Sequence, residues 1–108
     1  MKKKILERDG FEIYFEALDD FLQKGDLDDS TYQETCDSIE NGSLVLFCAK
    51  VTVEKAGIEI ISDYLGSCIY ESEEQFYTEE NGYFQDMVNT VLKEAPQALQ
   101  DLIEKLKK

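Results

Sequence analysis

Carboxylates are the side chains in this sequence that could carry chemistry, because its 108 residues include 24 Asp and Glu but no His. Without histidine a Ser-His or Cys-His pair cannot form, so nucleophilic catalysis is not expected. No glycine-rich phosphate loop or dinucleotide fingerprint is present. Carboxylates alone can bind a hard cation or transfer protons. Four close pairs are candidates: Glu59 with Asp63, Asp28-Asp29, Glu73-Glu74 and Glu79-Glu80.

These acidic pairs have a simpler structural interpretation. Glu59 and Asp63 are spaced to share one face of a strand, and Asp28-Asp29 precede Ser30 at the expected start of a helix. None of the pairs belongs to a run of acids alternating around a glycine, as in a calcium loop. We therefore predict capping and solvated surface for them, with no catalytic residue, no metal site and no cofactor.

A second group of residues could form an interface. Tyrosines and phenylalanines alternate with acids from Tyr70 to Asp86, and an acidic rim around exposed tyrosines suits docking on a Lys/Arg-rich groove. Asp63 and Tyr64 are possible anchors near a strand end. The predicted partner-binding residues are Asp63, Tyr64, Glu71, Glu73, Glu74, Tyr77, Glu79, Glu80, Tyr83 and Asp86. The alternatives are a strand end with Tyr64 in the core, and a plain solvated helix pair.

The charge distribution supports a binding role. The net charge is −13, and six of the eleven basic residues lie within the first four or last four positions. Two stretches, from Asp26 to Ala49 and from Ala56 to Leu92, contain no base at all. A body with this imbalance repels nucleic acid and anionic membranes and attracts basic protein surfaces. We expect a basic protein as the partner, and no direct contact with nucleic acid or membrane.

The remaining composition indicates one intracellular domain. Cys36, Cys48 and Cys68 are odd in number and widely spaced, which predicts small buried thiols rather than disulfides or a zinc site. No apolar run approaches the ~20 residues that cross a bilayer. The basic start, 1–4, is not followed by the apolar segment of a signal peptide. We expect a single domain over residues 1–108, located in the cytoplasm, of a host bacterium if a phage encodes it.

Two strand pairs are predicted. Residues 11–18 alternate apolar and polar, which favours a strand, paired with 3–7 as a hairpin across Asp9-Gly10. The same apolar residues also fit helical spacing, so a helix over this segment is the alternative. A second hairpin is predicted over about 44–64, with its turn at 54–57.

Helices are predicted over about 30–41, 72–80 and 83–106. Ser30 with Gln33 and Ser72 with Gln75 have the spacing of capping boxes. Asn81-Gly82 predicts the end of the second helix, and Pro96 either kinks the third helix or begins a new one. With the helices packed on one face of a small antiparallel sheet, the fold class is α+β.

The chain resembles the small, acidic, single-domain inhibitors of phages and other mobile elements, such as anti-CRISPR and antirestriction proteins that mimic DNA. The features that match are its length, its base-free acidic stretches and the acidic, aromatic run Glu71–Tyr77. The resemblance is one of overall character and assigns no residue by alignment. It implies a non-catalytic protein whose carboxylates lie where duplex phosphates would be, and which inhibits a basic, nucleic-acid-handling protein.

Three other functions fit the same composition. An immunity protein for a basic nuclease toxin would use the same charge-steered capture. A carboxylate-based metal-binding domain or enzyme would use one of the acidic pairs. An adaptor with an acidic surface is the third. The sequence leaves open whether the protein is a monomer or a homodimer that pairs through a sheet edge.

Overall fold

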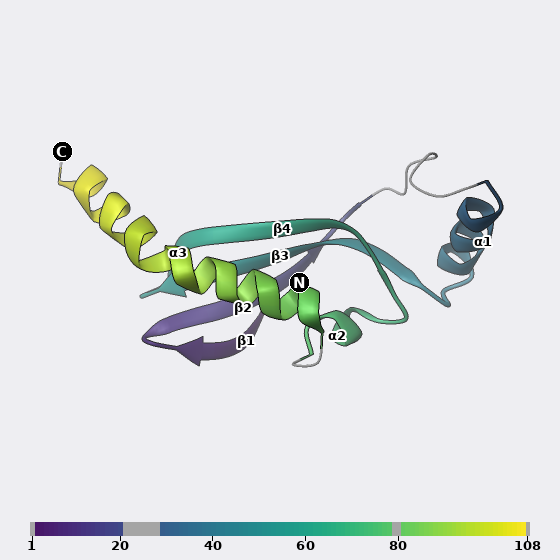
Figure 1. The fold of residues 1–108 in the computed structure, drawn as a ribbon, viewed down its shortest axis with the longest axis horizontal. Coiled ribbons are helices and arrows are strands. Elements are labelled where there is room, and N and C mark those ends of the chain that lie inside the picture. Colours follow the sequence, from purple (N-terminus) through teal and green to yellow (C-terminus); the bar gives the residue numbers. More distant parts are fainter. Residues whose placement is uncertain (1, 21–28, 79–80, 108) are drawn as a thin grey trace.

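The computed structural model describes residues 2–20, 29–78 and 81–107, which form a four-stranded antiparallel sheet and three helices (Figure 1). The strands are β1 (Lys2–Arg8), β2 (Phe11–Leu18), β3 (Val45–Lys55) and β4 (Ile58–Tyr70). Their order in the sheet is their order in the chain, so each strand pairs with its sequence neighbour. The predicted α+β fold class is confirmed.

Two tight turns set the strand pairing. Asp9-Gly10 joins β1 to β2, and Ala56-Gly57 joins β3 to β4. All four residues have positive φ, between 53° and 82°. Two-residue turns of this kind match the right-handed twist of antiparallel strands, so they favour hairpins. The strand over 11–18 and both hairpins are therefore confirmed, and the alternative helix is not formed.

β4 continues beyond its predicted end. The sequence predicted that the strand ends near Tyr64 and a turn follows, whereas β4 runs to Tyr70. Phe47 pairs with Cys68 and Ala49 pairs with Leu65, so β4 holds one extra residue between these pairs. That extra residue makes a β-bulge, and Ser67 in it has φ 54°. The chain therefore bends at Ser67 within a strand that continues to Tyr70.

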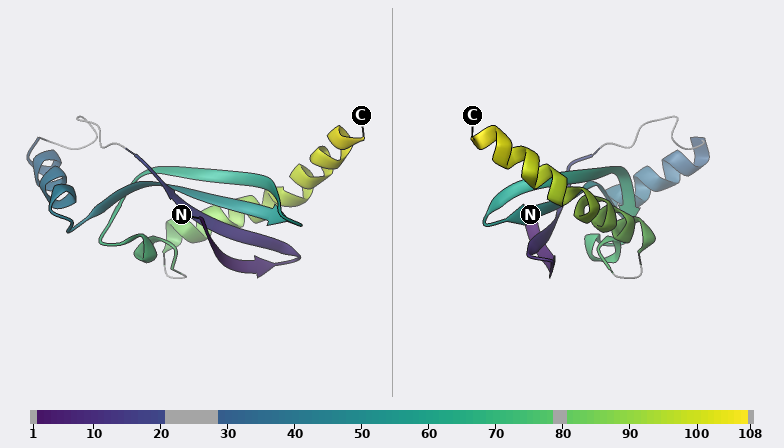
Figure 2. Two further views of the ribbon diagram at one scale, coloured as in Figure 1. Left: turned by 180° about the vertical axis from the view of Figure 1, so that it is seen from behind. Right: turned by 60° about the vertical axis from the view of Figure 1, so that its left-hand side comes forward.

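The core lies on one face of the sheet, under α3 (Gly82–Leu106) (Figures 1 and 2). Alternate residues of β3 point to this face and are at most 3% exposed: Phe47, Ala49, Val51 and Val53. The buried residues of α3 are Phe84, Met87, Val88, Val91 and Ala95. Pro96 lies inside this single helix, so no new helix begins there. Beyond it the last turns leave the sheet, and Leu106 is 72% exposed.

A cluster of aromatic rings holds α2 (Glu73–Phe76) against the sheet. The Phe76 side chain is fully buried. Its ring centroid lies 5.5–5.9 Å from four others: Phe15, Phe47, Tyr70 and Phe84. Three of these contacts are edge-on, the arrangement that the ring quadrupole favours. One side chain thus joins β2, β3, β4 and α3.

The N-terminus of α3 differs from the prediction. Asn81 caps α3, because its Oδ1 accepts the Phe84 N–H at 3.2 Å. Its Nδ2 also donates to the Tyr70 hydroxyl at 3.1 Å. Asn81-Gly82 therefore begins the third helix rather than ending the second, and that prediction was wrong. The second helix is shorter than predicted, since α2 ends at Phe76.

The capping box predicted for Ser72 and Gln75 is not formed as expected. Ser72 is the N-cap of α2, but its side chain makes no capping hydrogen bond. The Gln75 side chain instead accepts the Glu71 N–H at 3.0 Å. The Gln33 amide donates to Asp37 at 2.9 Å within the other predicted helix. α2 forms without a side-chain cap because the burial of Phe76 holds it against the sheet.

α1 (Asp29–Glu40) confirms the helix predicted over 30–41, but its position differs. The sequence predicted that all helices pack on the sheet. Figures 1 and 2 show α1 apart from the sheet, beyond the end at which β3 begins. Its apolar stripe explains this, because Tyr32, Cys36 and Ile39 are only half-buried and the stripe is too thin for a core contact.

Replacing Phe76 by alanine is expected to lower the free energy of unfolding by about 3–5 kcal/mol, because it removes a fully buried ring from the core. Urea titration followed by circular dichroism measures the loss. Tyr83→Ala is the control, since Tyr83 is 65% exposed and its loss should cost less than about 1 kcal/mol. Equal losses in the two variants would contradict the central role of Phe76.

Candidate partner-binding surface

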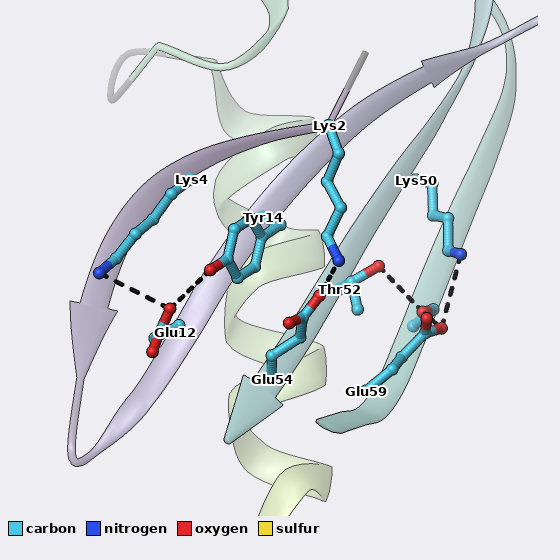
Figure 3. Close-up of polar contacts among 9 residues, drawn as sticks. Lys2, Lys4, Glu12, Tyr14, Lys50, Thr52, Glu54 and Glu59 are labelled. Carbon is cyan, nitrogen blue, oxygen red and sulfur yellow. Dashed lines mark hydrogen bonds and ion pairs between the residues drawn. The ribbon is translucent and has the colours of Figure 1, made fainter. Parts of the chain in front are cut away.

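The sheet face opposite the helices carries a network of paired charges (Figure 3). Lys2 on β1 forms an ion pair with Glu54 on β3, whose side chain is only 9% exposed. Lys4 lies 3.7 Å from Glu12 on the neighbouring strand. Lys50 lies 3.5 Å from Glu59 on β4, completing a set of pairs across all four strands. The acids of this face are therefore largely neutralised.

Hydroxyl groups strengthen this network. The Tyr14 hydroxyl donates to Glu12 at 2.6 Å, and this bond lowers the pKa of Glu12 and raises that of Tyr14. The Ser62 hydroxyl donates to Glu59 at 2.7 Å, which lowers the pKa of that carboxyl despite partial burial. A carboxyl that works as a general acid near neutral pH needs a raised pKa. These shifts have the opposite sign and fit a structural role.

The predicted pairing of Glu59 with Asp63 was wrong. A register shift between Val53 and Glu54 places a bulge in the hairpin next to Glu59. Glu59 consequently faces the charged network, where it contacts Lys50. Asp63 pairs with the buried Val51 and lies on the helix side of the sheet. The two carboxylates point to opposite faces and cannot share a cation or a proton.

A different group of acids surrounds α2. Glu71, Glu73 and Glu74 are exposed, and none of them forms an ion pair among the residues described. Beside them is an open pocket of about 440 Å³. Its lining residues come from β1, β2, β3 and the α2 segment: Lys3, Phe15, Val45, Glu71, Ser72, Glu73, Glu74 and Tyr77. Carboxylates therefore rim a partly aromatic hollow.

Tyr77 and Lys3 form one wall of this pocket. The Lys3 ammonium donates to the Tyr77 hydroxyl at 3.2 Å and lies 5.1 Å from the centre of its ring. This hydrogen bond raises the pKa of Lys3, and the charge of Glu74 adds to the effect. The Tyr77 ring packs 4.9 Å from that of Phe15, so it is half-buried rather than freely exposed.

The structure brings together four of the predicted partner-binding residues, namely Glu71, Glu73, Glu74 and Tyr77, at this pocket. We call these four residues the α2 acidic surface. Tyr83 and Asp86 are exposed on the first turns of α3, and Tyr83 lines a second pocket of about 350 Å³ with the end of β4. Glu79 and Glu80 lie outside the described residues.

The other two predicted residues lie on β4. Tyr64 is 56% exposed, so the alternative that placed it in the core was wrong. Its ring lies 5.8 Å from the Lys50 ammonium on the charged face. Asp63 is on the opposite face, and its Oδ1 accepts the Tyr64 N–H at 3.0 Å. Both residues are thus removed from the α2 acidic surface.

The N-terminal lysines are the site residues that sequence reasoning missed. The sequence predicted a strand over 3–7 but gave its lysines no partners, whereas Lys2, Lys3 and Lys4 of β1 contact acids or Tyr77. The predicted hairpin could have revealed the position of Lys3, because its pairing places Lys3 beside Phe15. Exposed acids without an ion pair among the described residues therefore remain on the helices: on α1, whose last turn carries no base, on α2, and on α3.

Other site types find little support. Within residues 2–20, 29–78 and 81–107, no group of three or more His, Cys, Asp or Glu side chains could hold a metal ion. The three cysteines are free thiols, and burial raises the pKa of Cys48 and Cys68. No helix in the described part of the chain is both long and apolar enough to span a membrane. Comparison with known proteins found no matching family model, curated protein or solved structure.

Replacing Tyr14 by phenylalanine is expected to raise the pKa of Glu12 toward its ordinary value of 4.5, because the hydroxyl that stabilises the ionised form is removed. Since the pKa of Glu12 is lowered in the folded state, its contribution to stability is present above the unfolded pKa. That contribution is lost as the pH falls through the folded value. NMR titration of the carboxyl carbons measures the change.

Tyr64→Phe is the control for this titration, because it removes the hydroxyl of a tyrosine that does not contact Glu12. The pKa of Glu12 should stay unchanged in that variant. An unshifted Glu12 in the Tyr14→Phe protein would refute the assigned hydrogen bond.

Proposed function

We propose that the chain is a non-catalytic acidic binding protein that inhibits a basic, nucleic-acid-handling protein by occupying its nucleic-acid-binding surface. The observation that carries this proposal is the α2 acidic surface. Its three glutamates are exposed and form no ion pair among the described residues, whereas the acids of the open sheet face are neutralised by lysines.

The separation of the two surfaces decides where a partner would bind. A cation approaching the open sheet face would have to displace Lys2, Lys4 or Lys50 from its carboxylate. A lysine or arginine approaching the α2 acidic surface would break no ion pair among the described residues, and the cation it would meet there is Lys3, which contacts Tyr77 and is attracted by Glu74. Complementary charge therefore favours the second approach and accelerates the encounter.

The α2 acidic surface also has the rigidity that an interface needs. Its glutamates shortly precede Phe76, whose ring is buried in the core, so the backbone that carries them is fixed before binding. A fixed backbone loses little conformational entropy on association. Tyr77 adds an aromatic wall, but the Lys3 ammonium already lies 5.1 Å from its ring, so the glutamates rather than this ring would hold an incoming arginine.

The chemistry of the carboxylates supports binding rather than catalysis. Where their pKa values are shifted, as in Glu12 and Glu59, the shift is downward. Such carboxylates stay ionised at neutral pH and serve the ion pairs of the open sheet face, where a general acid would need a raised pKa.

The test compares two triple variants in capture of proteins from a host lysate. Glu71→Gln, Glu73→Gln and Glu74→Gln together remove the charge of the α2 acidic surface. A matched triple on α3 removes the same charge elsewhere: Glu94→Gln, Asp101→Asn and Glu104→Gln. The wild type and the α3 variant should retain the same nucleic-acid-binding protein, and the α2 variant should lose it. Binding of a labelled oligonucleotide to the purified target should fall as the inhibitor approaches equimolar amounts.

Salt provides the second measurement. At about 0.5 M NaCl the screening length falls to about 4 Å, so charge attraction should fail and the target should elute. Retention that is insensitive both to salt and to the α2 triple variant would refute the proposal. Capture of a target whose oligonucleotide binding is unaffected would refute the inhibitory mechanism.

A further inference from the structure

The outer edge of β4 is an unpaired sheet edge. β4 is the last strand in the order β1-β2-β3-β4, and its middle borders open space in Figure 1. A strand at such an edge presents N–H and C=O groups that can pair with another chain. Ile58 and Tyr64 on this strand are 51% and 56% exposed, so apolar surface accompanies the open backbone.

Two irregularities limit the part of this edge that can accept another strand. The register with β3 shifts near Glu59 and again between Leu65 and Cys68. Between these shifts the five residues of 61–65 pair regularly with 49–53. Regular pairing gives a flat frame, whereas bulges bend and twist a strand away from a neighbour. Residues 61–65 are therefore the docking frame of β4.

The side chains of this frame indicate the kind of strand that fits it. Asp63 lies on the helix side and forms no ion pair among the described residues, so a cation beside it would gain a partner. Tyr64 lies on the other face, where its ring already has the Lys50 ammonium 5.8 Å away. A second cation beside Tyr64 would be repelled by Lys50. The complementary strand thus places a basic residue beside Asp63 and an uncharged residue beside Tyr64.

A second copy of this chain fits the frame poorly. Antiparallel pairing of two β4 strands about their middle would place Asp63 close to its own equivalent, and like charges across strands are destabilising. The edge of β1 is basic, but a bulge lies between Lys4 and Leu6 and its lysines are already engaged. Charged side chains and bulges are features that protect sheet edges.

We propose that residues 61–65 accept an extended segment of the basic partner as a fifth strand, with a lysine or arginine placed beside Asp63. This inference rests on the proposed function, since it describes how the same partner is held. Backbone hydrogen bonds would supply affinity, and the charge on Asp63 would select basic residues. The Tyr64 N–H, which donates to Asp63 in the free protein, is available for exchange to the incoming strand.

The test uses the full chain and a capped synthetic peptide of about eight alternating valines and lysines. Amide shifts in an ¹⁵N–¹H NMR titration locate the binding, and they should centre on 61–65. The matched probe is the same peptide with every backbone nitrogen methylated, which keeps every charge but removes the N–H donors along both edges. It should lose the β4 shifts.

Asp63→Asn keeps a side-chain acceptor for Tyr64 and removes the charge, so it should weaken peptide binding about two- to fivefold. Glu94→Gln, which removes one charge from α3, should leave the affinity unchanged. Equal binding of the methylated peptide at β4, or no shift at 61–65 with either peptide, would overturn the fifth-strand inference. Salt-sensitive shifts of both peptides at Glu71, Glu73 and Glu74 alone would overturn it too, while supporting the proposed function.

Discussion

The burial of the Phe76 ring is the contact on which the rest of the structure depends. α2 has only four residues, and a helix of that length has no stability of its own in water. It exists because Phe76 is enclosed by rings from three strands and from α3. The same contact fixes Glu73 and Glu74, which precede Phe76 in α2. A core interaction thus determines where exposed negative charge is held.

The distribution of the lysines matters more than the net charge of −13. β1 brings Lys2 and Lys4 onto the open sheet face, where they neutralise carboxylates that would otherwise repel one another. Burying Glu54 almost completely is possible only because Lys2 accompanies it, since an unpaired buried charge is costly. The α2 acidic surface, by contrast, keeps its charge. The lysines of β1 therefore neutralise the acids of the open sheet face and leave those of the α2 acidic surface exposed.

Local sequence signals predicted the elements well and their ends less well. Alternation and the Asp9-Gly10 turn predicted β2, because burying one face of a strand imposes a period of two. The same rule misplaced Asp63 relative to Glu59, since a bulge shifts the period and a bulge depends on pairing with β3. Asn81-Gly82 was assigned to the end of the second helix, whereas Asn81 caps α3 through Phe84 and is also held by Tyr70, a contact from another element that the sequence does not reveal. The glutamates of α2 were recognisable from their types, but their grouping required the position of Phe76.

The two proposed contacts are connected through the chain. β4 leads directly from the docking frame at 61–65 to Tyr70, and Glu71 follows at once. A strand that pairs with β4 and extends in that direction would approach the end of the sheet at which α2 lies (Figure 1). Backbone hydrogen bonds alone would accept strands of many sequences, whereas charge attraction alone would accept basic surfaces of many shapes. A partner that makes both contacts must present an extended basic segment next to a basic surface. This double requirement would limit an acidic protein to a few of the many basic proteins that it meets.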